Sequence, residues 1–374
     1  MAANSEDEKW MRRALLLAAK GYTRPNPMVG CVLVKDGRKI GEGYHHFAGQ
    51  PHAEVEALRS LTESVEGATA YVSLEPCCHF GRTPPCTDAL IASRVKRVVV
   101  AAVDPDARVS GKGLEILRAA GMDVTSGVLA ERANQLNAAF VHYHTQRSPY
   151  TIIKAAMTVD GKIATSTGKS RWITGTESRR EVHKMRARSS AVMVGVGTLL
   201  ADDATLTARL SPPPPVQPMR IVVDSRLRTP VDCSAVRAIS EEAQLLIATT
   251  EGASYDAGQR LIDVGAEVLR LPSTDNRVDL RHLMRALAER SIISILVEGG
   301  AELNASLIRG NLAQRMVVFV APLLFGGKEA RTPVEGGGID QVESAIRLGK
   351  LVSKRYGADV TLEADIVPSG VSGS

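Results

Sequence analysis

The chain has 374 residues, which is long enough for about two domains that each bury a core of their own. Apolar residues make up 44% and charged residues 23%, and this ordinary globular balance excludes a disordered or collagen-like chain. The aromatic fraction of 4% argues against a stacking platform for single-stranded nucleic acid. A net charge of +5 is too small to indicate a nucleic-acid or membrane partner, but clustered basic side chains would suit a phosphorylated small molecule.

The first half of the chain alternates between strand and helix patterns. A capping box at 5–8 predicts a helix that continues to about residue 20. Strands are expected at 29–34, 39–44, 70–74, 97–103 and 122–125, with a turn at 35–38 joining the first two. Further helices are expected at 52–61, 87–93, 111–120 and 130–138. After the opening hairpin, this alternation predicts a largely parallel sheet that is covered on both faces.

The segment 140–149 interrupts the alternation and is expected to link two domains, residues 1–147 and 148–374. A second α/β series follows, with strands expected at 150–157, 191–194, 220–224, 245–249, 267–271, 292–297 and 316–320. A proline run at 212–215 predicts an extended surface loop, and the tail beyond Pro368 is expected to be frayed. The start of the chain lacks the pattern of a secretion signal, and no apolar run is long enough to span a bilayer. We therefore expect a cytoplasmic protein.

The sharpest chemical pattern is His52-Ala53-Glu54 followed by Pro76-Cys77 and, further on, by Cys86. Imidazole and two thiolates are good zinc ligands, and three protein ligands leave a fourth position for a water molecule that the metal activates. Glu54 lies two residues after His52 at a predicted helix start, where it is placed to move protons rather than to bind the metal. The order H-x-E and then P-C is the signature of zinc nucleobase deaminases.

Other arrangements of the cysteine cluster remain open at this point. A purely structural zinc site would usually recruit a fourth protein ligand, for which His79 is a candidate. Common deaminases have two residues between their cysteines, whereas eight separate Cys77 from Cys86, and Cys78 could replace Cys77. We favour Cys77, which follows the proline, because adjacent cysteines rarely both bind one metal. The remaining two cysteines lie in a strand and in a loop and are expected to bind no metal.

The second half contains no G-x-G-x-x-G motif after a strand, so the usual dinucleotide fingerprint is absent. Two other strand-to-helix turns are candidates for ligand binding. Glu298-Gly299-Gly300 closes an apolar strand before a predicted helix at 302–309, and such a helix start offers free N–H groups to a phosphate. The glycine-containing stretch 195–198 also follows a strand. A basic segment at 179–188 is expected to be mostly a solvated helix face.

Two longer motifs make the pattern specific, namely TRPNPMVG at 23–30 and CCHFGRTPPC at 77–86. Together with RWIT at 171–174, they make the chain resemble the bifunctional deaminase–reductases of riboflavin biosynthesis over nearly its whole length. The resemblance implies an N-terminal cytidine-deaminase-like α/β/α domain and a C-terminal dihydrofolate-reductase-like α/β domain. It also implies the substrate, 2,5-diamino-6-ribosylamino-4(3H)-pyrimidinone 5′-phosphate, from which hydrolytic deamination releases ammonia. NADPH-dependent reduction of the ribosyl group would then give 5-amino-6-(5-phospho-D-ribitylamino)uracil.

The same resemblance implies roles for individual residues. In the deaminase domain, Glu54 would be catalytic, one Zn²⁺ would be held by His52, Cys77 and Cys86, and Asn26 and Arg82 would bind the substrate. The residues implied at the NADPH site are Met157, Trp172, Thr198, Asp202, Ser225, Gly300, Ala301, Glu302, Leu303, Asn304, Ala305 and Ser306. Those implied on the substrate side of the reductase are Ser170, Arg186, Leu206, Arg209 and Glu298. Of these, Arg186 and Arg209 would clamp the 5′-phosphate, because a guanidinium fork pairs two phosphate oxygens. A homo-oligomer is also implied.

Two hypotheses compete with this one. An RNA-editing zinc deaminase with a C-terminal RNA-binding domain would share the H-x-E and P-C core. The low aromatic content, the mild charge and the residues inserted between the cysteines argue against it. A zinc-stabilised binding protein without catalysis would have no need for Glu54 beside its metal ligand.

Overall fold

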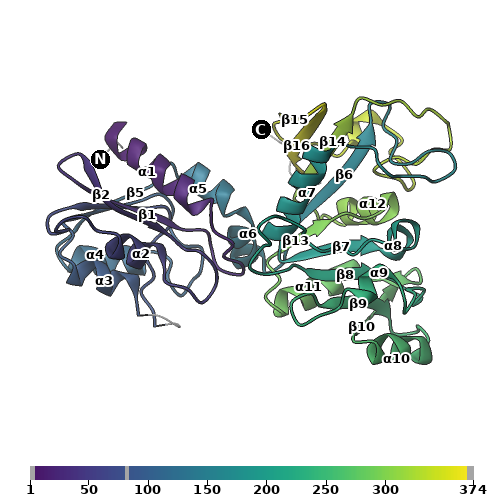
Figure 1. Cartoon of the computed structure of the whole chain (residues 1–374), viewed down its shortest axis with the longest axis horizontal. Helices are drawn as coiled ribbons and strands as arrows, with labels where there is room; N and C mark the ends of the chain where they lie inside the picture. The colour runs from purple at the N-terminus through teal and green to yellow at the C-terminus, as the bar shows by residue number, and fades with distance from the viewer. Residues whose placement is uncertain (1–4, 81–83, 369–374) are drawn as a thin grey trace. The chain divides into compact units, whose positions relative to one another are not determined.

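Two sheets, each with cores of its own, organise the computed structural model, which describes residues 5–80 and 84–368. The chain divides into two units, Met1–Arg147 and Ser148–Ser374 (Figure 1). Arg82 and the tail beyond Pro368, for which the sequence carries predictions, lie outside the described residues. No described helix combines the length and the apolar character that crossing a membrane would require.

The first unit is a five-stranded sheet in the order β2-β1-β3-β4-β5. Its strands are β1 (Gly30–Lys35), β2 (Arg38–Tyr44), β3 (Thr69–Val72), β4 (Arg97–Val100) and β5 (Asp123–Ser126). Its helices are α1 (Ser5–Ala18), α2 (Ala53–Arg59), α3 (Cys86–Ala92), α4 (Lys112–Ala119), α5 (Ala130–Leu136) and α6 (Ala138–Gln146). The predicted strands are confirmed. However, β1 runs antiparallel to both of its neighbours, so the sheet is parallel only from β3 to β5.

Alternating side chains of the strands build one core on each face of this sheet. Leu33, Val72 and Val98 pack in one core with α2, α3 and α4. Their neighbours in the strands point the other way and pack with α1, α5 and α6. The predicted α/β/α layering is therefore confirmed, and the two helix layers lie on opposite sides of the sheet in Figure 1.

The prediction of a linker at 140–149 was wrong over most of that segment. Residues 140–146 belong to α6, and Phe140 is buried against the core on the α1 side of the sheet. Polar residues and histidines dominate the sequence here, but tertiary packing supplies most of a helix's stability, and Phe140 packs into the core. The chain passes between the two units in the few residues from Arg147 to Tyr150.

The second unit is a nine-stranded sheet in the order β10-β9-β8-β7-β13-β6-β14-β16-β15. Its strands are β6 (Tyr150–Thr158), β7 (Ala191–Gly195), β8 (Met219–Val223), β9 (Leu245–Thr250), β10 (Glu267–Leu271), β13 (Ser294–Val297), β14 (Arg315–Ala321), β15 (Val352–Tyr356) and β16 (Asp359–Asp365). A separate two-stranded hairpin consists of β11 (Ser273–Thr274) and β12 (Arg277–Val278). The helices are α7 (Thr176–Arg188), α8 (Val196–Asp202), α9 (Ser234–Arg237), α10 (Tyr255–Asp263), α11 (Leu280–Glu289) and α12 (Ala301–Arg309), with a 3₁₀ turn η1 (Val342–Ser344).

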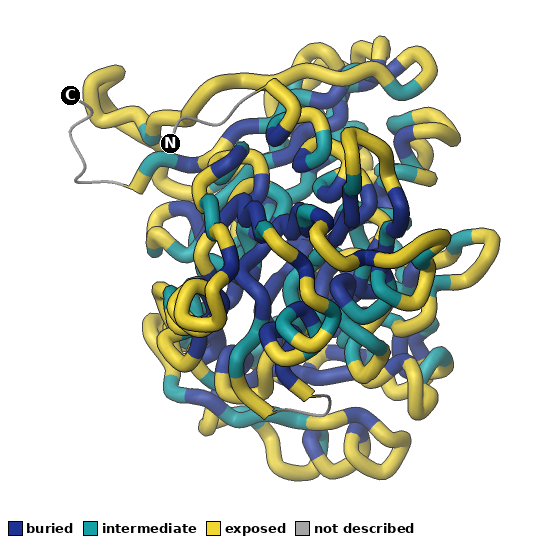
Figure 2. The backbone as a smooth tube through the Cα atoms, turned by 90° about the vertical axis from the view of Figure 1, so that its left-hand side faces the viewer, coloured by how far each residue is buried: buried dark blue, intermediate teal, exposed yellow. Residues whose placement is uncertain are grey.

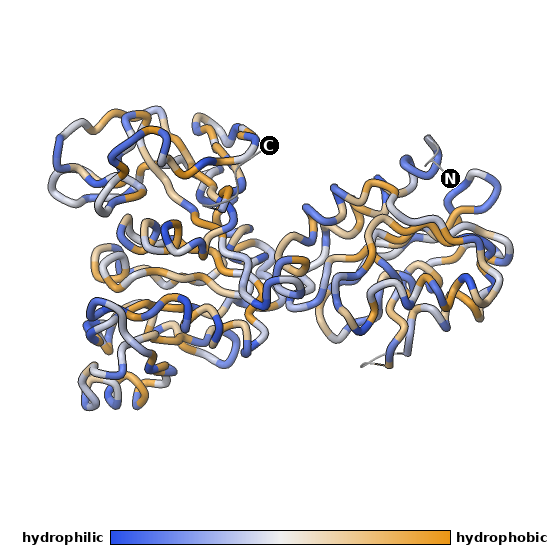
Figure 3. The backbone as a smooth tube through the Cα atoms, turned by 180° about the vertical axis from the view of Figure 1, so that it is seen from behind, coloured by the Kyte–Doolittle hydropathy of each residue, from blue (hydrophilic) through white to orange (hydrophobic). Residues whose placement is uncertain are grey.

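All seven strands predicted for this unit are confirmed, and they run parallel to one another. Most of their residues are apolar, and β9 and β13 are buried throughout, whereas β10 is mostly only partly buried. Figures 2 and 3 show the burial and the hydropathy of the residues along the backbone. The antiparallel strands β15 and β16 and the β11–β12 hairpin were not predicted.

Because its strands run parallel, the second unit has one edge at which the carboxyl ends of several strands meet. Strands β6, β7, β8 and β13 all have their carboxyl ends on the same side, where Gly195 ends β7 and where Asp224 and Glu298 directly follow β8 and β13. Open α/β sheets usually bind ligands outside this edge.

Candidate active sites

Three side chains of the first unit meet as the sequence predicted for a metal site. The Nδ1 atom of His52 lies 3.2 Å from Sγ of Cys86 and 3.4 Å from Sγ of Cys77. His52 directly precedes α2, Cys86 opens α3, and the backbone N–H of Cys86 donates to Sγ of Cys77 at 3.3 Å. Among the described residues, neither Cys78 nor His79 joins this cluster. The cluster therefore offers three protein ligands, the number typical of catalytic zinc.

The ionisation of the cluster follows from its hydrogen bonds. The pKa of Cys77 falls to about 4 because Cys86 and His52 donate to its sulfur. Hydrogen bonding to Cys77 also raises the pKa of His52. A thiolate is thus stabilised where a cation would bind, and the donor set of one imidazole and two cysteine sulfurs fits Zn²⁺.

Glu54 lies in the first turn of α2 and is only 3% exposed. Its pKa is raised to about 7, mainly by burial and also by the nearby negative sulfur of Cys77. A carboxyl group that titrates near neutral pH can both accept and release a proton there. This is the property that a proton-transfer residue beside the metal ligands requires.

Asn26 is held in the same region by a histidine that the sequence analysis did not single out. His45 is buried, and its Nδ1 lies 3.1 Å from the carbonyl oxygen of Pro51. Because a carbonyl only accepts, Nδ1 carries the hydrogen, and Nε2 accepts from Nδ2 of Asn26 at 3.2 Å. Burial lowers the pKa of His45, which favours this neutral form. The amide nitrogen of Asn26 is thereby directed to His45.

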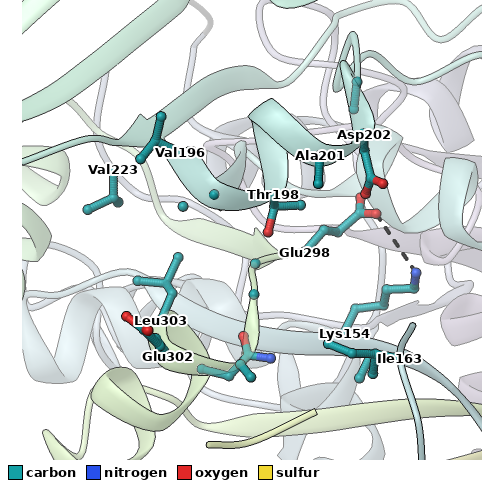
Figure 4. A pocket seen from close by; sticks show the side chains of 18 of the residues that line it. Lys154, Ile163, Val196, Thr198, Ala201, Asp202, Val223, Glu298, Glu302 and Leu303 are labelled. Carbon is teal, nitrogen blue, oxygen red and sulfur yellow. Dashed lines mark ion pairs between the residues drawn. The ribbon is translucent and has the colours of Figure 1, made fainter. Parts of the chain in front are cut away.

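A cavity of about 2090 Å³ occupies the carboxyl edge of the parallel strands in the second unit. This volume exceeds the roughly 300–1,000 Å³ of a typical small-molecule pocket, so a dinucleotide and a second ligand can share it. The predicted site residues that line it are Ser170, Trp172, Arg186, Thr198, Asp202, Arg209, Ser225, Glu298, Gly300, Ala301, Glu302, Leu303, Asn304 and Ser306. In Figure 4, Val223, Glu302 and Leu303 lie toward one end of the pocket and Lys154, Ile163 and Asp202 toward the other.

Three residues predicted at this site do not line the cavity. Leu206 and Ala305 are only 2% exposed, and Leu206 packs in the core that includes Val194 and Val222. Met157 lies at the end of β6 beyond the lining residues 154–156. The buried side chains of Leu206 and Ala305 are therefore closed off from the cavity.

Glu298 is the centre of an ion-pair network in the cavity. Nε and Nη2 of Arg186 donate to its two carboxylate oxygens at 2.5 and 3.0 Å, and Nη1 of Arg186 donates to the carbonyl of Thr207. Arg186 therefore pairs with a carboxylate, and the clamp in which it joins Arg209 around a phosphate stays a prediction. Burial alone would raise the pKa of Glu298, but Arg186 and Lys154 outweigh it and lower the pKa.

Lys154, on β6, is a cavity residue that the sequence analysis missed. Its Nζ lies 3.9 Å from Oε2 of Glu298, and Figure 4 shows its amino group directed toward Glu298 and Asp202. Burial lowers the pKa of Lys154, and Glu298 opposes that shift. A partly desolvated ammonium group is a better proton donor than one in water. The only local signal was a single lysine within an apolar strand.

Basic side chains line much of the cavity. Arg171, Arg179, Arg180, Arg186 and Arg209 all line it, so part of the segment 179–188 faces the cavity and not only solvent. His183, in the same segment, accepts the backbone N–H of Arg209 at 3.1 Å. Burial and the neighbouring cations Arg186 and Arg209 lower the pKa of His183 to about 4. The surroundings are suited to an anionic ligand.

The low pKa of His183 predicts an acid-sensitive second unit. Its pKa is about 4 in the folded chain against an ordinary value of 6.5, so protons bind more readily to the unfolded chain. The contribution of the neutral ring to stability is fully present above the ordinary pKa and is lost as the pH falls toward the folded value. Glutamine does not titrate in this range. Between about pH 7 and pH 5, the melting temperature of His183→Gln should therefore fall less than that of the wild type. Equal losses in the two proteins would contradict this assignment.

Each half of the chain matches the model of a known protein family. The family model described as RibD C-terminal domain matches residues 149–362. The model described as cytidine and deoxycytidylate deaminase zinc-binding region matches residues 4–102. The riboflavin biosynthesis protein RibD of Actinobacillus pleuropneumoniae is 44% identical over 96% of both chains. The RibD of Aquifex aeolicus is 43% identical over 95% of this chain and 97% of its own.

Solved structures agree with these matches over the whole fold. A structure of Acinetobacter baumannii RibD superposes with a TM-score of 0.86 at 37% identity, covering 97% of this chain and 99% of its own. A Thermotoga maritima structure described as a diaminohydroxyphosphoribosylaminopyrimidine deaminase/5-amino-6-(5-phosphoribosylamino)uracil reductase gives 0.84 at 36% identity over the same shares. These comparisons lend no support to an RNA-editing enzyme.

Proposed function

The chain belongs to the RibD family of bifunctional riboflavin-biosynthesis deaminase–reductases, and we propose that its two units carry these two activities in chain order. The unit Met1–Arg147 deaminates 2,5-diamino-6-ribosylamino-4(3H)-pyrimidinone 5′-phosphate with one Zn²⁺. The unit Ser148–Ser374 then reduces the ribosyl group of the product with NADPH. The observation that carries this proposal is the meeting of His52, Cys77 and Cys86 beside the buried Glu54.

In the deaminase, the two cysteines and His52 hold the metal, which when bound supplies Lewis-acid activation of water at neutral pH. Glu54 accepts a proton from the water that attacks the amine-bearing ring carbon, and it passes a proton to the departing amine. The C–N bond breaks, a C–O bond forms, and ammonia leaves. Asn26, oriented by His45, hydrogen-bonds the pyrimidine. Arg82, outside the described residues, is retained as a second substrate contact.

In the reductase, the start of α12 suits the phosphates of a dinucleotide. Gly300 precedes this helix and lines the cavity, and a side chain there would crowd Oγ1 of Thr198 at 3.2 Å, so a glycine leaves the helix start accessible. Oδ1 of Asn304 is buried without a hydrogen-bond partner among the described residues. This orphaned acceptor suits a hydroxyl group of the bound nucleotide. The residues present therefore fit NADPH.

NADPH supplies a hydride, and the protein supplies position and a proton. Reduction of ribosyl to ribityl forms a C–H bond at C1′ and breaks the bond between C1′ and the ring oxygen, which gains a proton. Lys154 is the group that donates this proton, with Glu298 holding its ammonium in place. The basic residues that include Arg171 and Arg209 bind the 5′-phosphate.

Replacing Glu54 separates the two activities. Glu54→Gln should lower the deaminase kcat by about 10²–10⁴-fold, because the amide cannot shuttle protons. Reduction of supplied deaminated product should stay within about twofold of the wild type, because the sites are independent. Ammonia release and NADPH oxidation measure the two steps. Glu56→Gln, on the same helix and paired with Arg59, is the control. Loss of both activities in Glu54→Gln would argue against two autonomous sites.

Lys154→Met should lower the kcat for NADPH oxidation by about 10²–10⁴-fold, since the methionine side chain has no proton to donate. NADPH binding, measured by quenching of protein fluorescence, should be preserved, as should ammonia release. Lys184→Met, which removes an exposed lysine paired with Glu181 on α7, serves as the control. A normal kcat in Lys154→Met would exclude Lys154 as the proton donor.

We further propose that the enzyme works in the cytoplasm as a homo-oligomer. Nine large apolar side chains are exposed in the segment 323–352, namely Leu323, Leu324, Phe325, Val334, Ile339, Val342, Leu348, Leu351 and Val352. Monomeric proteins rarely leave so much apolar surface open to water. The open edge of β15 adjoins this segment and offers unpaired backbone groups.

The oligomer proposal predicts the effect of surface charges on assembly. Val342 is 85% and Leu324 is 77% exposed, so aspartate at either position should not disturb the fold of the unit. Leu324→Asp combined with Val342→Asp should reduce the sedimentation coefficient of the wild-type oligomer to that of a monomer. Ile262→Asp, at an exposed position on α10, should leave it unchanged. A wild type that sediments as a monomer would refute the proposal.

A further inference from the structure

Glu75, which directly precedes Pro76 and Cys77, is a buried carboxylate with no part in the mechanism given above. The residue is 4% exposed, yet four backbone N–H groups donate to its side chain. Oε1 accepts from Gly113 at 2.9 Å and from Leu114 at 3.3 Å, at the start of α4. Oε2 accepts from Asp104 at 3.1 Å and from Gly111 at 2.9 Å, in the loop after β4. These charge-assisted bonds offset the cost of removing the carboxylate from water.

Gly113 allows the start of α4 to pack closely against the backbone of the segment that contains Glu75 and Pro76. A Cβ atom at this position would lie 2.3 Å from the carbonyl oxygen of Pro76 and 3.1 Å from Oε1 of Glu75. Real Cβ atoms do not approach backbone oxygens so closely, so only glycine allows this packing. The start of α4 therefore touches the backbone of Pro76 and also binds the side chain of Glu75.

The segment that carries Cys77 is fixed at both ends. On the far side, the backbone N–H of Thr87 donates to the carbonyl of Cys77 at 3.2 Å, and that of Cys86 donates to its sulfur at 3.3 Å. On the near side, Pro76 allows little rotation, so the position of Glu75 is transmitted to Cys77. Metal ligands must be placed to within about 0.2 Å.

We propose that Glu75 is a positioning residue of the deaminase, which sets the place of the zinc ligand Cys77 by anchoring its segment to α4 and to the loop after β4. The inference rests on the proposed zinc site in the first unit. It makes the loop at 104–111 and Gly113 parts of the same support, although none of them belongs to the ligand cluster.

The first test compares full-length wild type with Glu75→Gln. The amide keeps the size of the side chain, but its NH₂ group faces two backbone N–H groups from which it cannot accept. We expect the affinity for Zn²⁺, measured by competition with a chromophoric chelator, to fall about 10- to 100-fold. The ligand-field absorption of the Co²⁺-loaded protein should shift as well. Glu115→Gln removes an equal charge from the exposed side of α4 and should bind both metals like the wild type.

Gly113→Ala reaches the same segment by a different route, because it keeps Glu75 and pushes on Pro76. The same loss of Zn²⁺ affinity and the same spectral shift are expected, and this variant decides the matter if Glu75→Gln does not fold. Lower thermal stability with unchanged Zn²⁺ affinity and Co²⁺ absorption would make Glu75 a purely structural residue and overturn the inference. If the wild type itself binds no Zn²⁺ and releases no ammonia, the proposed zinc site has failed, and the inference fails with it.

Discussion

A carboxylate that is removed from water must be neutralised, paired or hydrogen-bonded, and this constraint shapes both sites of the chain. Burial is the main cause that raises the pKa of Glu54 to about 7, although the neighbouring His52 opposes the shift. Glu298 is gripped by Arg186 and approached by Lys154, and its pKa is lowered. Glu54 in the first unit can therefore exchange protons near neutral pH, whereas Glu298 in the second unit keeps its negative charge.

The parts of the fold that could be predicted from sequence are those whose local pattern matches their burial. Runs such as 98–100 and 191–194 are apolar throughout because both faces of a parallel strand are covered. Strand β15 could not be found in this way, because every residue from Val352 to Arg355 is exposed and nothing alternates. Helix α6 was missed for a related reason, since a single buried aromatic side chain, Phe140, anchors most of its length.

The site residues also divide into those that a short sequence motif reveals and those that only the fold reveals. His52, Glu54, Cys77 and Cys86 belong to short motifs whose chemistry is legible without a structure, although only the fold shows that the cysteine after the proline joins the cluster. Lys154 and Arg186 acquire their surroundings from Glu298, which lies more than a hundred residues away in each case. No local spacing contains that information. Leu206 lies next in sequence to residues that line the cavity, yet its side chain packs in the core. Sequence position alone does not determine the direction of a side chain.

The spacing of the zinc ligands has a consequence for the stability of the first unit. His52 is separated from Cys77 by 25 positions, and Cys77 from Cys86 by 9, so one ion bound to all three closes a long loop and a short loop of the chain. Closing such loops restricts the unfolded chain, and a ligand held only by the folded form shifts the folding equilibrium by mass action. The metal would therefore act as a removable cross-link as well as a reagent. Among the described residues, no comparable cluster exists in the second unit. A cell short of zinc would then weaken the fold of one half of the enzyme and leave the other half intact.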